Sequence, residues 1–115
     1  MKKLIKAFVY SNILAWFSLF SVIYLWKKPF ILTILLICFS VLMLIVFKSK
    51  NNFYLYFFTA LAGALSEIIA IVFGVWEYGF PNFVGIPYWL PFLWGIAGLF
   101  IKVISLEIDS FLKKK

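Results

Sequence analysis

The feature that most constrains this chain is a series of four apolar blocks separated by short polar connections. The blocks cover residues 7–26, 30–47, 53–76 and 88–106. A helix of about 20 apolar residues crosses the hydrocarbon core of a bilayer, whereas strands and ordinary core helices are shorter. Hydrophobic residues make up 66% of the 115 residues and charged residues 13%, whereas soluble domains are about half apolar and a quarter charged. We therefore predict an all-α integral membrane protein, a four-helix transmembrane bundle that forms one domain over residues 1–115.

The lysines predict how the four spans are oriented. One side of the membrane would carry Lys2, Lys3, Lys6, Lys48, Lys50, Lys113, Lys114 and Lys115, and the other only Lys27 and Lys28. The positive-inside rule then places both termini in the cytoplasm of a multi-pass plasma-membrane protein. The first residues also imitate a signal peptide, but the apolar stretch continues to Trp26 without a small-residue cleavage site. We interpret it as a retained first span, with a cleaved signal as the alternative.

Composition excludes several classes of function. The formal net charge is +7, yet arginine is absent, and no guanidinium is present for bidentate recognition of phosphate or guanine. The lysines lie at the edges of the blocks, so we expect membrane lipid and not nucleic acid as their partner. With no histidine and one cysteine, Cys38, the chain lacks the usual ligands of zinc, haem and iron–sulfur clusters. We expect no metal, no cofactor and no Cys–His or Ser–His catalytic pair.

Glu67 stands alone as a carboxylate inside the third block. A charged group deep in a bilayer costs a few kcal/mol on insertion scales, which makes such a residue a functional candidate by default. Small residues flank it at helical spacing, and a similar series marks the fourth block. The two series are Ala60, Gly63, Ala70 and Gly74, and Pro91, Gly95, Gly98, Lys102 and Ser105. Small residues let membrane helices approach closely, so we expect these two faces to pack together.

Two interpretations of Glu67 remain open at this point. Counted from the outer ends of the blocks, Glu67 lies about 13 Å deep and Lys102 about 18 Å deep, within reach of a lysine side chain. The carboxylate can therefore be a structural partner of Lys102 that fixes the register of two helices. Alternatively it is a working group, in a pocket that opens outward. Glu77 would fall on nearly the same helical face and line this pocket, or it is an ordinary interfacial residue.

Aromatic residues and prolines surround the turn between the third and fourth blocks. Residues 78–89 would form a roof over the pocket, because Pro81 and Pro87 restrict the backbone and Gly85 permits a tight turn. The aromatics are either membrane anchors or the walls of a site that stabilises a cation. As anchors, Trp26, Trp76, Tyr78, Tyr88 and Trp89 would form an outer belt, and Tyr10, Tyr54 and Tyr56 an inner one. The candidate ligand-binding residues are Glu67, Glu77, Trp76, Tyr78, Trp89, Trp94 and Lys102.

This aromatic segment resembles sequences in two groups of membrane proteins. The pattern is Glu67 followed by Gly74-x-Trp76-x-Tyr78-x-x-Pro81-x-x-x-Gly85-Ile86-Pro87-x-Trp89-Leu90-Pro91-x-x-Trp94. It is similar to small uncharacterised prokaryotic four-span membrane proteins and, faintly, to carotenoid-biosynthesis domains of the lycopene cyclase type. The latter resemblance implies an aromatic motif, a Gly-Ile pair and a proline followed by paired acids. Here Phe92 and Leu93 follow Pro91, so the acids are missing.

A third resemblance is one of size. Small multidrug transporters have four spans, a similar length and one membrane glutamate. In that family the glutamate lies in the first span, whereas Glu67 lies in the third.

These observations lead to three hypotheses about function. The leading one is a non-catalytic or transport-type bundle that binds a lipid-like or cationic amphipathic molecule between the third and fourth spans, with Glu67 as the polar contact. The second is a membrane-embedded enzyme acting on an isoprenoid or lipid, with Glu67 or Glu77 as acid or base. The third is an accessory subunit of a membrane complex. Because four short helices enclose little volume, we expect a homo-oligomer or a partner membrane subunit.

Overall fold

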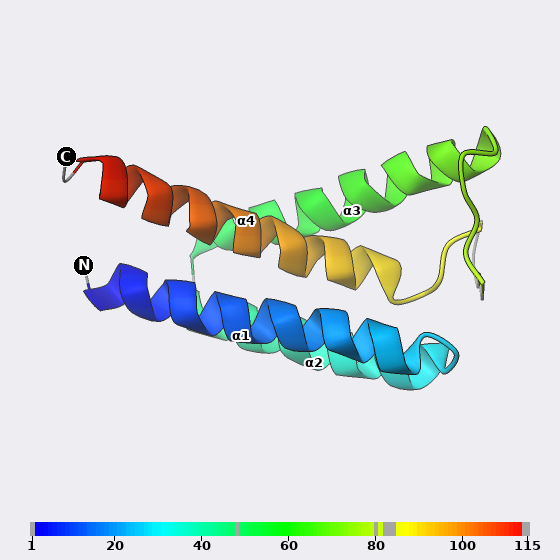
Figure 1. The fold of residues 1–115 in the computed structure, drawn as a ribbon, viewed down its shortest axis with the longest axis horizontal. Coiled ribbons are helices and arrows are strands. Elements are labelled where there is room, and N and C mark those ends of the chain that lie inside the picture. The colour runs from blue at the N-terminus through cyan, green and yellow to red at the C-terminus, as the bar shows by residue number, and fades with distance from the viewer. Residues whose placement is uncertain (1, 48, 80, 82–84, 114–115) are drawn as a thin grey trace.

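The computed structural model describes residues 2–47, 49–79, 81 and 85–113. These residues form α1 (Lys2–Leu25), α2 (Pro29–Val46), α3 (Lys50–Val72) and α4 (Leu90–Lys113). Each of the four helices is long and apolar enough to cross a membrane, as the sequence predicts. Figure 1 shows that α1 begins and α4 ends at the same end of the molecule. Lys48, Lys114 and Lys115, which contribute to the predicted charge bias, lie outside the described residues.

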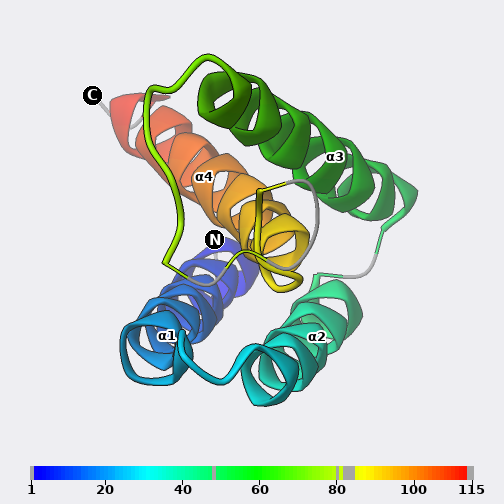
Figure 2. The same cartoon turned by 90° about the vertical axis from the view of Figure 1, so that its right-hand side faces the viewer.

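The last helix, α4, occupies the centre of the arrangement. It packs against α1, α2 and α3, and its contact with α3 is the most extensive in the molecule. Figure 2, viewed along the helices, shows α4 between the α1–α2 pair and α3. The buried residues of α4 recur at helical spacing and include two glycines. They are Leu90, Gly95, Ile96, Gly98, Leu99 and Val103. This stripe of apolar and small residues lets three helices pack on one.

Glycines set the close approach of α3 and α4. A Cβ atom on Gly98 would collide with the side chain of Thr59, and one on Gly95 with the ring of Tyr56. The predicted packing of the two small-residue faces is therefore confirmed. The sequence placed Tyr56 in an interfacial aromatic belt, and this is wrong. Its ring is buried against Gly95, and its hydroxyl donates a hydrogen bond to Ser40 of α2.

The helix α2 combines an inner stripe with an outer apolar wall. Leu32, Leu36, Ser40 and Met43, spaced three or four residues apart, are buried. Other large side chains, such as Phe30 and Ile34, are exposed on the outer face of the helix. Pro29 lies in the first turn of α2, where its missing N–H group costs little.

Local signals fix both ends of α3. The hydroxyl of Ser49 caps its start by accepting a hydrogen bond from the backbone N–H of Asn52. Its end is a Schellman motif, in which Gly74 has a φ of 80°. The Gly74 N–H bonds to the carbonyl of Ile71 and the Val75 N–H to that of Ala70. The predicted third span continued to Trp76, whereas α3 ends at Val72 because the left-handed glycine turns the chain away.

The described part of the connection between α3 and α4, residues 73–79, 81 and 85–89, folds back against the helices. Figure 1 shows it running from the end of α3 toward the ends of α1 and α2 before it enters α4. Ile86, Pro87 and Trp89 are buried, and a Cβ atom on Gly79 would come within 2.7 Å of the Trp26 ring. We call this end of the molecule the loop end. The opposite end, with Lys6, Lys50 and Lys113, is the basic end.

Candidate functional site

Glu67 lies half-buried on α3, between α4 and the connection. Both of its carboxylate oxygens accept hydrogen bonds. The hydroxyl of Tyr78, on the connection, donates to Oε1, and the indole Nε1–H of Trp94, on α4, donates to Oε2 at 2.6 Å. Three segments distant in sequence therefore meet at one carboxylate. Hydrogen bonds to an ionised acceptor are stronger than those between neutral groups.

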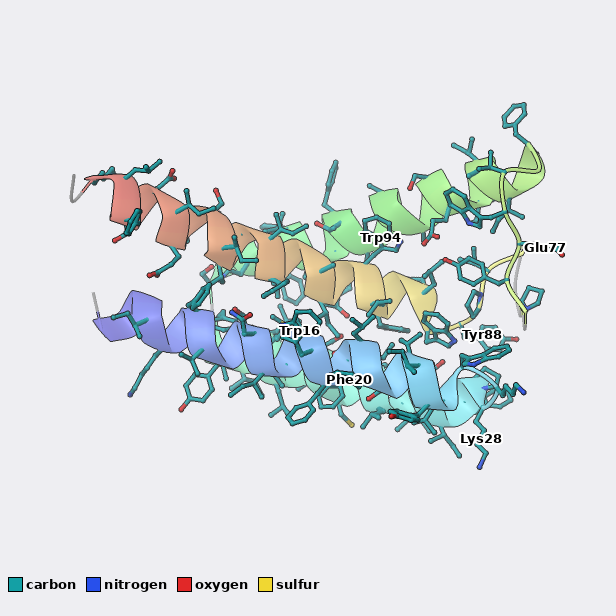
Figure 3. The ribbon with its side chains drawn as sticks, in the orientation of Figure 1. Trp16, Phe20, Lys28, Glu77, Tyr88 and Trp94 are labelled. Atoms are coloured by element: carbon teal, nitrogen blue, oxygen red, sulfur yellow. The ribbon has the colours of Figure 1, made fainter. Side chains whose placement is uncertain are left out.

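The position of Trp94 depends on a glycine one turn before Glu67. A Cβ atom on Gly63 would overlap the indole ring of Trp94. The ring thus occupies the space that the missing side chain leaves, and from there its N–H group reaches Glu67. Figure 3 shows Trp94 directed from α4 toward α3. The predicted small-residue face of α3 therefore both brings the helices together and seats a hydrogen-bond donor.

Tyr78 is the donor that the connection supplies. Burial raises the pKa of the Tyr78 hydroxyl above its usual value of 10.0, and the hydrogen bond to Glu67 and its negative charge raise this pKa further. The phenol therefore keeps its proton and remains a donor at neutral pH. Because Gly74 ends α3 early, the chain turns back and Tyr78 faces Glu67 eleven residues away in sequence.

Trp89 completes the aromatic wall of the site. Its ring meets that of Tyr78 edge to face, with centroids 6.2 Å apart and an interplanar angle of 88°. The Trp89 side chain is 5% exposed, and its Nε1–H group lacks a hydrogen-bond partner within the part of the chain that the structure describes. Buried donors without a partner are rare in proteins. Trp89 was expected in the outer aromatic belt, and its burial overturns that expectation.

A cavity of about 260 Å³ adjoins these groups. Its walls are Glu67, Tyr78, Trp89 and Trp94 together with Leu90, Leu93 and Ala97. The structure therefore brings together four of the seven predicted site residues. The three apolar residues of α4 in this wall were not among the predicted residues. Their signal was available, because Leu90, Leu93 and Ala97 share the helical face of Trp94.

Two of the predicted residues, Glu77 and Trp76, lie apart from this cavity. Both are exposed on the connection, and Figure 3 shows Glu77 directed outward at the loop end. The expectation that Glu77 shares a helical face with Glu67 is wrong, because α3 ends at Val72 and the two residues are not on one helix.

Lys102 also lies elsewhere. Its ammonium group donates a hydrogen bond to Oδ1 of Asn52, near the start of α3. This contact takes the place of the Glu67–Lys102 pair, which was one of the two interpretations of Glu67 left open by the sequence. With α3 ending at Val72, Glu67 is about 8 Å from the loop end of its helix, whereas Lys102 is about 18 Å from the start of α4. The sequence analysis did not predict Asn52 as a partner of Lys102. The signal was available, because Asn52 directly precedes the third block and a lysine near the end of the fourth block can extend its ammonium group toward that end of the bundle.

The electrostatics of the site follow from these contacts. Both hydrogen bonds to Glu67 come from uncharged donors. When the carboxyl group is ionised, these donors do not neutralise its negative charge. Three aromatic rings stand beside it, and the faces of such rings attract cations. A carboxylate framed by tryptophan and tyrosine is an arrangement that can hold an ammonium group with apolar substituents.

No known protein family, curated protein or solved structure matches this chain.

Proposed function

We propose that this chain is an integral membrane protein with both termini in the cytoplasm that binds a cationic amphipathic molecule at Glu67 and transports it. Four helices of membrane-crossing length support the membrane location. The orientation rests on the lysines, which gather at the basic end, while Lys27 and Lys28 lie at the loop end. The loop end, with the Glu67 site, would then face outward.

The observation on which this proposal rests is that both hydrogen-bond donors to Glu67 are uncharged groups. A structural ion pair with Lys102 would have cancelled its charge, but Lys102 bonds to Asn52. Tyr78 and Trp94 orient the carboxylate and leave its charge available to a ligand. The cationic head would lie against the faces of the aromatic rings, and an apolar tail would follow Leu90, Leu93 and Ala97 along α4.

The small cavity supports an assembly of more than one copy. A volume of about 260 Å³ holds a head group but not the whole of a long amphipathic molecule. A second copy of the chain, or a partner membrane subunit, would enclose the rest of the path.

The test is binding of dodecyltrimethylammonium to the protein in lipid nanodiscs, measured by calorimetry, with dodecyl maltoside as the uncharged analogue. We expect Glu67→Gln to weaken binding of the ammonium compound about tenfold or more, since one charged contact is lost. Glu77→Gln removes an exposed carboxylate of the same type and serves as the matched control, with binding unchanged. Equal weakening by both substitutions would contradict a site at Glu67.

The same variants separate the alternative functions. An accessory subunit predicts that Glu67→Gln lowers stability while the wild type binds neither compound. A membrane-embedded enzyme predicts turnover of an isoprenoid or lipid substrate that disappears in Glu67→Gln. Transport predicts uptake of the bound cation into vesicles that contain the wild-type protein, and no uptake with the variant.

A further inference from the structure

A second cavity, larger than the one beside Glu67, lies at the basic end. Its volume is about 540 Å³, within the range of small-molecule sites. It opens between α1 and α4, where α2 ends and α3 begins. Phe47, Leu99, Val103 and Leu106 contribute to its largely apolar wall, and Lys6 and Lys102 provide its two ammonium groups.

Lys102 is held in place at this cavity. Its ammonium group donates to Oδ1 of Asn52, and Nδ2 of Asn52 in turn donates to the carbonyl oxygen of Phe47 at 2.6 Å. Asn52 thus ties α4 to the turn between α2 and α3. An ammonium group has three N–H donors, so donors beyond the one used by Asn52 remain for a ligand. Asn52 lies in the first turn of α3, and in a bilayer crossed by this helix it would be close to the lipid head groups.

The charge at this cavity has one sign. Among the described lining residues, the charged groups are Lys6 and Lys102, and no carboxylate is present. Glu107 and Asp109 follow further along α4 and are not part of this lining. A half-buried ammonium group is stable when an anion accompanies it, and the hydroxyl of Tyr10 adds a further donor at the wall.

We propose that this cavity binds an anionic phospholipid of the adjacent leaflet, with its phosphate between Lys6 and Lys102. The first segment of an acyl chain lies along Val46 and Leu106, the exposed aliphatic side chains of this wall, and the rest of the chain continues into the bilayer. Two positive groups select an anionic head, and the apolar wall selects a lipid over a free ion. This site is separate from the Glu67 site and does not depend on its function.

Native mass spectrometry of the protein released from detergent tests this proposal. Phosphatidylglycerol and phosphatidylcholine with identical acyl chains are added in turn. We expect the wild type to bind phosphatidylglycerol more tightly, and Lys102→Gln to weaken this binding about tenfold, as for the loss of one charge-assisted hydrogen bond. Lys27→Gln is the matched control, because Lys27 is an exposed lysine at the loop end with its ammonium 5.3 Å from the Trp26 ring centroid.

Several results would overturn the proposal. Equal affinity of the wild type for both lipids would remove the charge selectivity, and equal weakening by Lys102→Gln and Lys27→Gln would remove the site. Full displacement of phosphatidylglycerol by millimolar inorganic phosphate would indicate a simple anion site.

If Lys102→Gln does not fold, as judged by circular dichroism, Lys6→Gln takes its place, since Lys6 is exposed. Glu67→Gln should bind phosphatidylglycerol as the wild type does.

Discussion

At Glu67, hydrogen bonds from a phenol and an indole take the place that an opposite charge would occupy in an ion pair. The difference matters because an ion pair is neutral as a whole, whereas this cluster carries the charge of its carboxylate. The two donors to Glu67 belong to different kinds of structural element. Trp94 belongs to a helix and fits against Gly63, whereas Tyr78 belongs to the connection. Opening of the connection would therefore release one oxygen of Glu67 and leave the other bound.

Tyr78 should give the protein a specific sensitivity to alkaline pH. The folded-state pKa of its hydroxyl is raised above 10.0 by burial and by Glu67. The stability that Tyr78 contributes is therefore present below the unfolded-state pKa and is lost as the pH rises through the folded-state pKa. We expect the free energy of unfolding to fall less steeply above about pH 10 in Tyr78→Phe than in the wild type.

Chemical denaturation in detergent at a series of pH values measures this difference. Tyr54→Phe is the control, because Tyr54 is an exposed tyrosine on α3. The same slope in all three proteins would show that Tyr78 does not remain protonated through its contact with Glu67.

Trp94→Phe tests the second donor at Glu67. Phenylalanine keeps an aromatic ring in the space beside Gly63 but lacks the N–H group that bonds to Oε2. We expect the free energy of unfolding to fall by about 1–2 kcal/mol, because a charged acceptor loses a partner. Chemical denaturation at neutral pH measures the loss. Trp16→Phe, on the exposed face of α1, should leave stability within about 0.5 kcal/mol.

At the scale of the helices, the contact of α3 with α4 depends on positions that have no side chain. Gly63, Gly95 and Gly98 each face a larger group on the opposite helix. Such contacts replace the hydrophobic effect as a source of helix association in lipid, where van der Waals packing provides much of the stabilisation. The chain therefore tolerates little added volume along this interface.

Gly63→Ala should disturb the Glu67 site through the helix interface. The added methyl group overlaps the Trp94 ring, and overpacking of this kind typically costs about 1–3 kcal/mol. We expect lower stability and a shift of tryptophan fluorescence as the indole moves from Glu67. Ala62→Leu adds more volume at the neighbouring exposed position and should change neither observable. A Gly63→Ala variant as stable as the wild type would contradict the close packing.

The hydrogen bond from Tyr56 to Ser40 links α3 to α2. Because both residues are buried, we expect Tyr56→Phe and Ser40→Ala each to lower stability by about 1 kcal/mol. The double variant should lose less than the sum of the two, since the same bond is removed in each. A double-mutant cycle from denaturation in detergent measures the coupling. Strict additivity would show that the two side chains act independently.

The sequence predicts the positions of the helices better than it predicts the contacts between residues of different helices. Apolar length defines the four blocks, because lipid requires each span to satisfy its own backbone. The end of α3 was missed by four residues, although Gly74 is a typical residue for the end of a helix. That error moved Glu67 deeper, brought it within reach of the Lys102 side chain and placed Glu77 on the same helix. Four site residues were still found, since Glu67 and the aromatics are conspicuous in an apolar chain.

The burial of Tyr56 depends on Gly95 of another helix, which no local pattern reveals.

At the scale of the whole molecule, the two ends differ in chemistry. The loop end carries exposed aromatics such as Trp76 and Tyr88 and the half-buried Glu67 site, and the basic end carries lysines around a larger cavity. Trp and Tyr are common at membrane interfaces, and lysines concentrate on the cytoplasmic side. Each proposed site would thus face a different leaflet.

Cysteine labelling in intact cells tests this orientation. In a Cys38→Ser background, Glu77→Cys and Asp109→Cys each introduce one exposed thiol, at the loop end and the basic end. We expect a membrane-impermeant maleimide to label the Glu77→Cys variant directly and the Asp109→Cys variant only after permeabilisation. The reverse pattern would invert the proposed topology.

The central position of α4 has a consequence for biosynthesis. The helices emerge from the ribosome in order, and α4 is the last of the four, yet α1, α2 and α3 all pack against it. Until α4 enters the membrane, α3 has no extensive described helix contact, and Glu67 lacks both Trp94 and the completed connection. In a nascent chain halted before α4, the Glu67 carboxylate would therefore lack the indole donor that fixes it in the folded protein.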